Sequence, residues 1–156
     1  MHSRHFLLFF SVTLGLLGVA QDALAQYQPK SVGLRGGVFT GITGKYFVFD
    51  DSEAIEGIVS FDSEGLLITG LYEFHRYDFA TESLRWYYGA GATARLGGTD
   101  EMGGSLQLGV DGIIGIEYLL GSSPLSLGLD WKPRLIFIGS SDFNSDDGAI
   151  SLRYQF

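Results

Sequence analysis

Apolar and polar side chains alternate along most of the chain after residue 30, and the alternation is clearest between residues 84 and 95. Leu84, Trp86 and Tyr88 fall on one face of this stretch, whereas Arg85 and Arg95 fall on the other. A period of two residues is typical of a β-strand that has one face in apolar surroundings. The pattern therefore predicts a protein built from antiparallel β-strands.

Eight strands account for this alternation, with polar turns between them. The predicted strands are residues 31–37, 42–49, 54–61, 66–75, 84–95, 106–118, 125–132 and 148–156. The predicted turns and loops are residues 39–41, 50–53, 62–65, 76–83, 96–104, 121–124 and 140–147. The first two strands could instead form one long bent strand over 31–49, and the seventh strand could continue through Pro133 to residue 138. An even number of strands returns both ends of the sheet to the same side of a closed barrel.

The polar face of the strands decides which side of such a barrel is inside. A soluble barrel and a membrane barrel show the same alternation with the faces exchanged. The polar face carries glycine where a surface in water would carry Lys, Glu, Thr or Ser, and glycine leaves room for a long neighbouring side chain in a narrow lumen. These glycines are Gly89, Gly91, Gly109, Gly115 and Gly128. The other face carries Trp86, Tyr88, Trp131, Tyr154 and Phe156, which suit lipid and its interfaces. The polar face is therefore predicted to line the lumen.

The charged residues of the predicted strands share the polar face, and both signs occur in similar number. They are Arg35, Lys45, Glu56, Glu73, Arg85, Arg95, Asp111, Glu117, Asp130, Lys132, Arg134 and Arg153. Side chains just fill the interior of an eight-stranded barrel, and a buried charge without a partner is costly. We therefore expect these groups to form a paired network that closes the lumen, rather than an open pore.

The first 25 residues have the features of an export signal. A weakly basic start with Arg4 is followed by an apolar run over residues 6–20 and by an Ala-x-Ala cleavage site at residues 23–25. The apolar run is shorter than the about 20 residues that a membrane-spanning helix needs, which disfavours the alternative of an amino-terminal anchor. We expect residues 1–25 to be removed on export and residues 26–156 to form a single domain.

Composition narrows the classes of partner. A formal net charge of −8 argues against nucleic acid, which binds basic surfaces. The sequence contains no cysteine, so no disulfide framework holds an exported chain together. After the predicted leader, no segment is long and apolar enough for a membrane helix. A membrane location would therefore require a closed barrel, which satisfies every strand backbone group in lipid.

Three motifs carry a resemblance to a known family: Tyr87-Tyr-Gly-Ala-Gly-Ala, the stretch 109–118 with its recurring glycines, and the terminal Leu152-Arg-Tyr-Gln-Phe156. With these motifs the chain resembles small eight-stranded outer-membrane barrels of the outer membrane protein X and opacity-protein type. The resemblance covers nearly all of the chain after the leader. It implies an all-β, antiparallel, up-and-down transmembrane barrel in the outer membrane of a Gram-negative bacterium.

The same resemblance implies partners and an assembly signal. Such a barrel contacts the lipid bilayer and lipopolysaccharide as a monomer, and its aromatic carboxyl-terminal strand, here with Tyr154 and Phe156, is recognised by the barrel-insertion machinery. Members of the family serve as adhesins or structural proteins, so the fold leaves the function open. The loops of this chain are short, whereas surface adhesion relies on long ones.

Candidate chemistry is sparse. His75 is the only histidine after the leader, and its local partners for catalysis are Glu73 and Ser83, with no serine two residues away on the same face. The stretch 142–148 resembles a calcium loop, but Arg153 stands where a bidentate glutamate is needed, so a solvated turn is expected. The sequence therefore predicts no catalytic, metal or cofactor site. It favours a non-enzymatic structural or surface-interacting barrel over a lipid A-modifying enzyme or a soluble periplasmic barrel that binds an apolar ligand.

Overall fold

The computed structural model describes residues 30–49, 51–62, 65–77, 79, 81, 83–97, 106–139 and 141–156. The predicted export signal, residues 1–25, lies outside these residues. Over the described ranges, the chain contains no helix that is long and apolar enough to cross a membrane.

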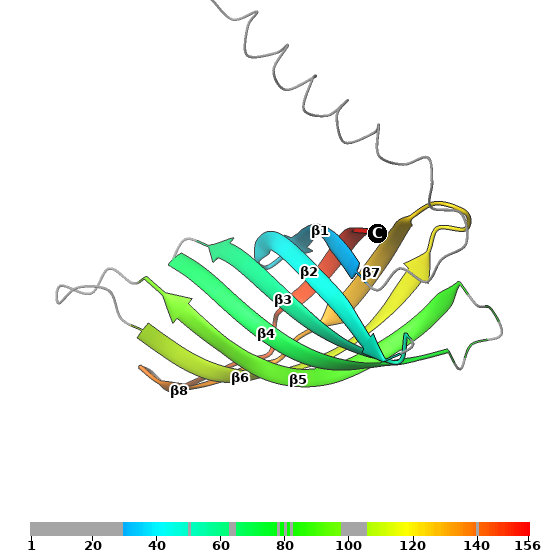
Figure 1. Cartoon of the computed structure of the whole chain (residues 1–156). Coiled ribbons are helices and arrows are strands. Elements are labelled where there is room, and N and C mark those ends of the chain that lie inside the picture. Colours follow the sequence, from blue (N-terminus) through cyan, green and yellow to red (C-terminus); the bar gives the residue numbers. More distant parts are fainter. Residues whose placement is uncertain are drawn as a thin grey trace, which may run out of the picture.

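Ten strands form one antiparallel sheet (Figure 1). They are β1 (Lys30–Gly37), β2 (Thr40–Phe49), β3 (Glu53–Asp62), β4 (Gly65–Arg76), β5 (Leu84–Leu96), β6 (Leu106–Leu119), β7 (Leu125–Trp131), β8 (Arg134–Ile138), β9 (Asp142–Asn144) and β10 (Gly148–Gln155). Each boundary lies within one or two residues of the prediction for the strands that the alternation identified.

The sheet closes into a barrel of eight strands. Consecutive strands pair from β1 to β6, and β10 pairs with both β1 and β7. Both β7 and β8 pair with β6, along Ile114–Leu119 and Leu108–Asp111 respectively, so together they occupy one position in the wall. The predicted all-β, antiparallel barrel of eight strands is therefore confirmed.

Residues 31–49 form two strands rather than one bent strand. The turn between them consists of Val38 and Phe39, one residue earlier than predicted, because Thr40 and Gly41 already pair with Phe61 and Ser60 of β3. The Phe39 side chain is buried in the mouth of the barrel, where the Arg134 guanidinium lies 5.1 Å from its ring centroid.

The seventh wall strand is broken at Lys132 and Pro133. Proline has no N–H to donate, and its carbonyl instead accepts a bond of 2.9 Å from the N–H of Gly112. Beyond the break, β8 pairs with β9, which lies inside the stretch 140–147 that was predicted as loop. That prediction was wrong for residues 142–144, because pairing with β8 outweighs the turn preference of Asp142 and Asn144.

The two faces of the wall differ as the alternation predicted. Apolar side chains point outward, and Leu34, Phe61 and Ile150 are 68%, 61% and 61% exposed. Polar and charged side chains point inward, together with a small apolar cluster of Ile58, Leu71, Tyr87 and Ile113. The protein therefore has an apolar outer wall around a polar interior.

Glycines on the inner face serve two different purposes. A Cβ at Gly115 would lie 2.6 Å from the Tyr87 ring, and one at Gly128 would lie 2.7 Å from the Arg153 guanidinium, so these two glycines make room for long side chains as predicted. A Cβ at Gly89 or Gly91 would instead meet a backbone carbonyl of β4, and one at Gly109 would meet a carbonyl of β8. For these three, the expected role was wrong: they allow close approach of the neighbouring strand.

Candidate functional site: the charged lumen

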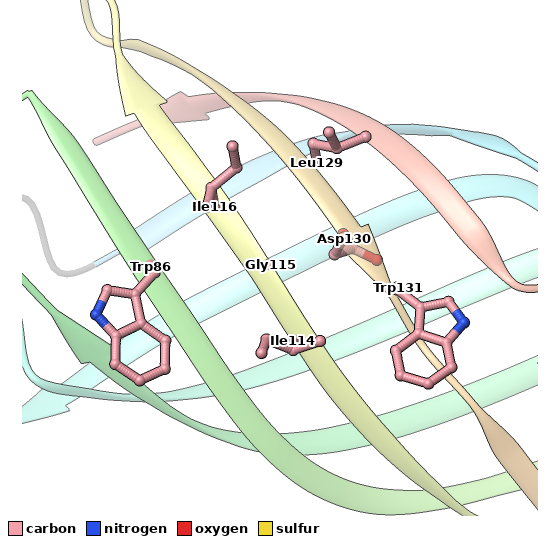
Figure 2. A pocket seen from close by; sticks show the side chains of 7 residues that line it. All are labelled: Trp86, Ile114, Gly115, Ile116, Leu129, Asp130 and Trp131. Atoms are coloured by element: carbon pink, nitrogen blue, oxygen red, sulfur yellow. The ribbon is translucent and has the colours of Figure 1, made fainter.

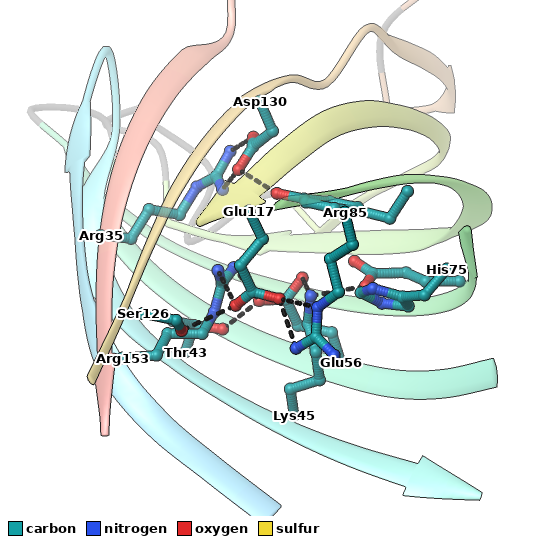
Figure 3. A network of polar contacts seen from close by, with 12 residues as sticks. Arg35, Thr43, Lys45, Glu56, His75, Arg85, Glu117, Ser126, Asp130 and Arg153 are labelled. Atoms are coloured by element: carbon teal, nitrogen blue, oxygen red, sulfur yellow. Dashed lines mark hydrogen bonds and ion pairs between the residues drawn. The ribbon is translucent and has the colours of Figure 1, made fainter. Parts of the chain in front are cut away.

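Among the residues that the structure describes, seven basic and six acidic side chains are buried in the interior of the barrel. The basic residues are Arg35, Lys45, Arg85, Arg95, Lys132, Arg134 and Arg153, and the acidic residues are Glu56, Glu73, Asp111, Glu117, Asp130 and Asp147. Figure 3 shows most of the central part of this network, with side chains from strands around the whole wall converging on the axis. The charged residues that the sequence places on the polar face of the strands are all buried.

One cluster lies at the end of the barrel away from Lys30 and Gln155, beside the break between β7 and β8. Arg134 donates to Asp111 at 2.9 Å and to Asp147 at 3.2 Å. The Lys132 ammonium lies 2.8 Å from the same Asp147 oxygen that accepts from Arg134. Two carboxylates thus hold two cations at the mouth, with Phe39 beneath Arg134.

A bidentate pair lies next along the lumen. The Arg35 guanidinium donates to both oxygens of Asp130, at 2.6 and 2.5 Å, and the Tyr87 hydroxyl donates to the same carboxylate at 3.0 Å. Planar guanidinium and carboxylate groups match in this geometry, which makes it the strongest kind of ion pair in proteins. The pair joins β1 to β7, which are separated in the sheet by β10.

In the next layer of the lumen, Glu117 accepts hydrogen bonds from several donors. Arg85 donates to it at 2.7 Å from Nε and approaches at 2.6 Å with a second nitrogen, while Ser126 donates to its other oxygen at 2.8 Å. Arg153 lies 3.5 Å from Glu117 and donates to Glu56 at 2.7 Å. Arg153 therefore links the Glu117 layer to a second pair of carboxylates.

Those two carboxylates, Glu56 and Glu73, share Lys45. The Lys45 ammonium lies 2.7 Å from Glu73 and 3.9 Å from Glu56, and it is also 4.3 Å from the centroid of the Tyr87 ring. The Thr43 hydroxyl donates to Glu56. Each of the six carboxylates that the structure describes in the lumen is therefore held by at least one cation.

His75, the candidate catalytic residue, is part of this packed interior. Its ring stacks on Tyr87 at 5.1 Å and meets Phe47 edge-on at 5.0 Å, and its Nε2 lies 3.1 Å from Glu73. Ser83 lies in the turn before β5, where its N–H donates to Thr81, and no bond joins it to His75 in the described ranges. The geometry therefore places His75 in the lumen without a bond to Ser83, the nucleophile that the sequence offered for it.

Several residues of the network were not expected from the sequence. Asp147 was assigned to a solvated turn, but it is buried and binds Lys132 and Arg134, which corrects that expectation. The alternation of the last strand, extended back by one step, would have predicted that Asp147 points inward, because Ala149, Ser151 and Arg153 also do. The alternation places the neutral donors Tyr87 and Ser126 on the polar face of their strands, but nothing in the sequence marks them as partners of Asp130 and Glu117.

The ends of the network are less enclosed. The Tyr77 hydroxyl, just beyond β4, accepts a bond of 2.8 Å from Arg85, and burial raises the pKa of Tyr77 against the opposing effect of that cation. Arg95 lies 5.9 Å from the Phe39 ring centroid at the other end. Over the described part of the chain, no three His, Cys, Asp or Glu side chains are arranged to hold a metal ion.

The residues of the predicted assembly signal lie where β10 meets the start of β1. The rings of Tyr154 and Phe156 stack at 6.4 Å, and the N–H of Phe156 donates to the Lys30 carbonyl at 2.9 Å. The Phe156 side chain is exposed. No protein-family model and no curated protein matches this chain.

Proposed function

We propose that the protein is a small outer-membrane barrel without enzymatic activity, with a structural or surface-interacting role and a lumen closed by paired charges. The observation that carries this proposal is the inverted distribution of side chains. Of the described residues, seven cations and six carboxylates are buried inside, while large apolar side chains cover the outer wall. An apolar outer band around a polar interior is typical of barrels of the outer-membrane type, which supports a membrane location.

The outer wall argues against the alternative of a soluble periplasmic barrel. Exposed apolar residues occur on every wall strand, for example Val32, Ile55, Val110 and Leu152. Soluble monomers rarely expose a contiguous apolar patch larger than a few hundred square ångströms. In a bilayer the same surface contacts lipid chains, and the eight wall positions pair around a closed ring, with β9 added on β8.

The paired charges support a closed lumen. The bidentate pair of Arg35 with Asp130 and the link from Glu56 through Arg153 to Glu117 cross the interior at successive levels. An eight-stranded wall has room for side chains and little more. Ions would have to break several buried pairs in order to pass.

The position of His75 supports the non-enzymatic proposal over a lipid A-modifying enzyme. Such an enzyme must present its base at the outer surface, where the lipid lies, whereas the His75 ring is 1% exposed between Tyr87 and Phe47. The resemblance to the outer membrane protein X and opacity-protein type supports a monomer that contacts the bilayer and lipopolysaccharide. In this proposal Tyr154 and Phe156 are read by the insertion machinery.

Two measurements test the proposal. Cell fractionation should place the chain in the outer membrane, and the extracted protein should migrate differently on a gel before and after heating. Recovery in the soluble pool would contradict the membrane location. In planar bilayers the purified protein should give no stable channel, so long-lived unitary conductance would contradict the closed lumen.

A further inference from the structure

A groove crosses the outer wall over β5, β6 and β7. It has a volume of about 410 Å³ and is lined by Trp86, Ile114, Gly115, Ile116, Leu129, Asp130 and Trp131. Figure 2 shows Trp86 and Trp131 on opposite sides of β6, with Ile114 and Ile116 between them. The Asp130 carboxylate at its floor is engaged by Arg35 and Tyr87 inside the barrel. The surface that the groove offers to the outside is therefore apolar.

A second hollow continues the groove along the wall. It has a volume of about 240 Å³, and it shares Ile116 and Leu129 with the first. The Trp131 side chain at the far rim is held by a bond of 2.5 Å from its indole N–H to the Ser145 carbonyl. This hydrogen bond holds the Trp131 ring in place at one rim of the groove.

The width of the groove limits what can lie in it. The two indole-bearing strands are separated by β6 alone, which is two strand spacings or about 10 Å between backbones. A helix with its side chains is about 10–12 Å across and cannot enter between the two rings. An extended alkyl chain fits this space and matches its apolar lining.

A row of residues that pair with one another across four strands leads from the groove to a basic residue. Arg76 is the last residue of β4 and pairs directly with Trp86, which pairs with Ile116, which pairs with Leu129. Trp86 is the third residue of β5, Ile116 the fourth from the end of β6 and Leu129 the fifth of β7. The row therefore starts at the end of the barrel that carries Lys30 and Gln155, and it runs from there towards the middle of the wall.

Arg76 differs from the other basic residues of the strands. It is exposed on the outer face and makes no ion pair with the residues that the structure describes, whereas seven cations are buried in the lumen. Lys30, on β1, is the other exposed cation of the strands. A guanidinium at the edge of an apolar wall suits a phosphate group, to which it donates two parallel bonds.

We propose that this row binds one anionic phospholipid, with the phosphate on Arg76 and one acyl chain in the groove between Trp86 and Trp131. The site rests on the proposed membrane location, because it takes its ligand from the leaflet on the side of the chain termini. The proposal adds to that location one class of lipid that the wall binds selectively, in contrast to the bulk lipid that surrounds any barrel.

The two tryptophans of the sequence make the site directly observable, because both rim the groove. Purified protein in neutral detergent micelles is titrated with phosphatidylglycerol that carries brominated acyl chains, which quench nearby indoles. We expect saturable quenching with a midpoint about fivefold lower than for brominated phosphatidylcholine, as one cation near a membrane surface provides. Arg76→Gln should abolish the fivefold preference, and Arg76→Lys should keep part of it.

Matched controls separate the site from general effects. Lys30→Gln removes the other exposed cation at the same end and should keep the full preference. Ile116→Phe fills the groove and should weaken quenching by both lipids. Each variant is first shown to be folded by its heat-dependent migration on a gel.

Two results would overturn the lipid site while leaving the membrane location intact. One is equal midpoints for the two lipids with the original protein, and the other is an unchanged preference in Arg76→Gln. Failure of the proposed function looks different, because the protein would then stay in solution without detergent and fail to float with phosphatidylcholine vesicles.

Discussion

Replacing Glu117 with glutamine tests the charged lumen at the point where most donors meet. The substitution keeps the shape of the side chain and removes its charge. Glu117 binds Arg85 through two nitrogens at 2.7 and 2.6 Å, accepts from Ser126 at 2.8 Å and lies 3.5 Å from Arg153. In the Glu117→Gln variant, Arg85 is left buried without a carboxylate.

The magnitude follows from the burial of that cation. Both side chains of the pair are buried, with 4% and 1% of their surface exposed, so water screens little of the interaction. Removing one partner of a buried pair costs about 3–5 kcal/mol, because the remaining charge loses its compensation. Arg85 keeps its bond to Tyr77 and its contact with the Phe47 ring, which places the expected loss at about 3 kcal/mol.

The assay is equilibrium unfolding by urea in phospholipid vesicles, followed by tryptophan fluorescence. Asp142→Asn serves as the control, because it removes the same charge from an exposed side chain of β9 and should change the free energy of unfolding by less than about 0.5 kcal/mol. The double variant Arg85→Gln with Glu117→Gln should lose less than the sum of its two single changes, by about 1–3 kcal/mol. Equal losses for Glu117→Gln and Asp142→Asn, or strict additivity in the double variant, would refute a paired lumen.

Three further predictions concern the wall and the end of the chain. Ala90→Arg, on the exposed face of β5, should lower stability in vesicles by roughly 2–4 kcal/mol in the same urea assay, and a tolerated arginine would reverse the assignment of the faces. Gly115→Leu should impair folding by crowding the lumen, since even a Cβ would lie 2.6 Å from the Tyr87 ring; normal heat-dependent migration would argue against that packing. Deleting Phe156 should reduce the amount of protein in the outer membrane, as measured by fractionation, and unchanged accumulation would count against an assembly signal.

The sequence alone determined which residues share a face. Successive side chains of a strand point to opposite sides, so the positions of Arg85 and Trp86 on different faces follow from the local backbone. Counting strands needed only the turns between alternating stretches, and the inward direction of the charged face followed from its glycines and from the aromatic residues opposite. These conclusions rest on neighbours in the chain. The structure agrees with the assignment of the faces, but it corrects the role expected of Gly89, Gly91 and Gly109 and adds the short strand β9.

The tertiary structure decided which charges meet. Arg35 binds Asp130 across 95 residues of chain, and Arg153 binds Glu56 across 97, because closure of the sheet brings distant strands to one axis. No local pattern encodes those distances. The break at Pro133 likewise depends on Gly112 and Asp147, which offer bonds that the strand itself lacks. The face that a side chain occupies is decided within each strand. The pairing of charges in the lumen and the row from Arg76 to Leu129 are decided only by the closed barrel.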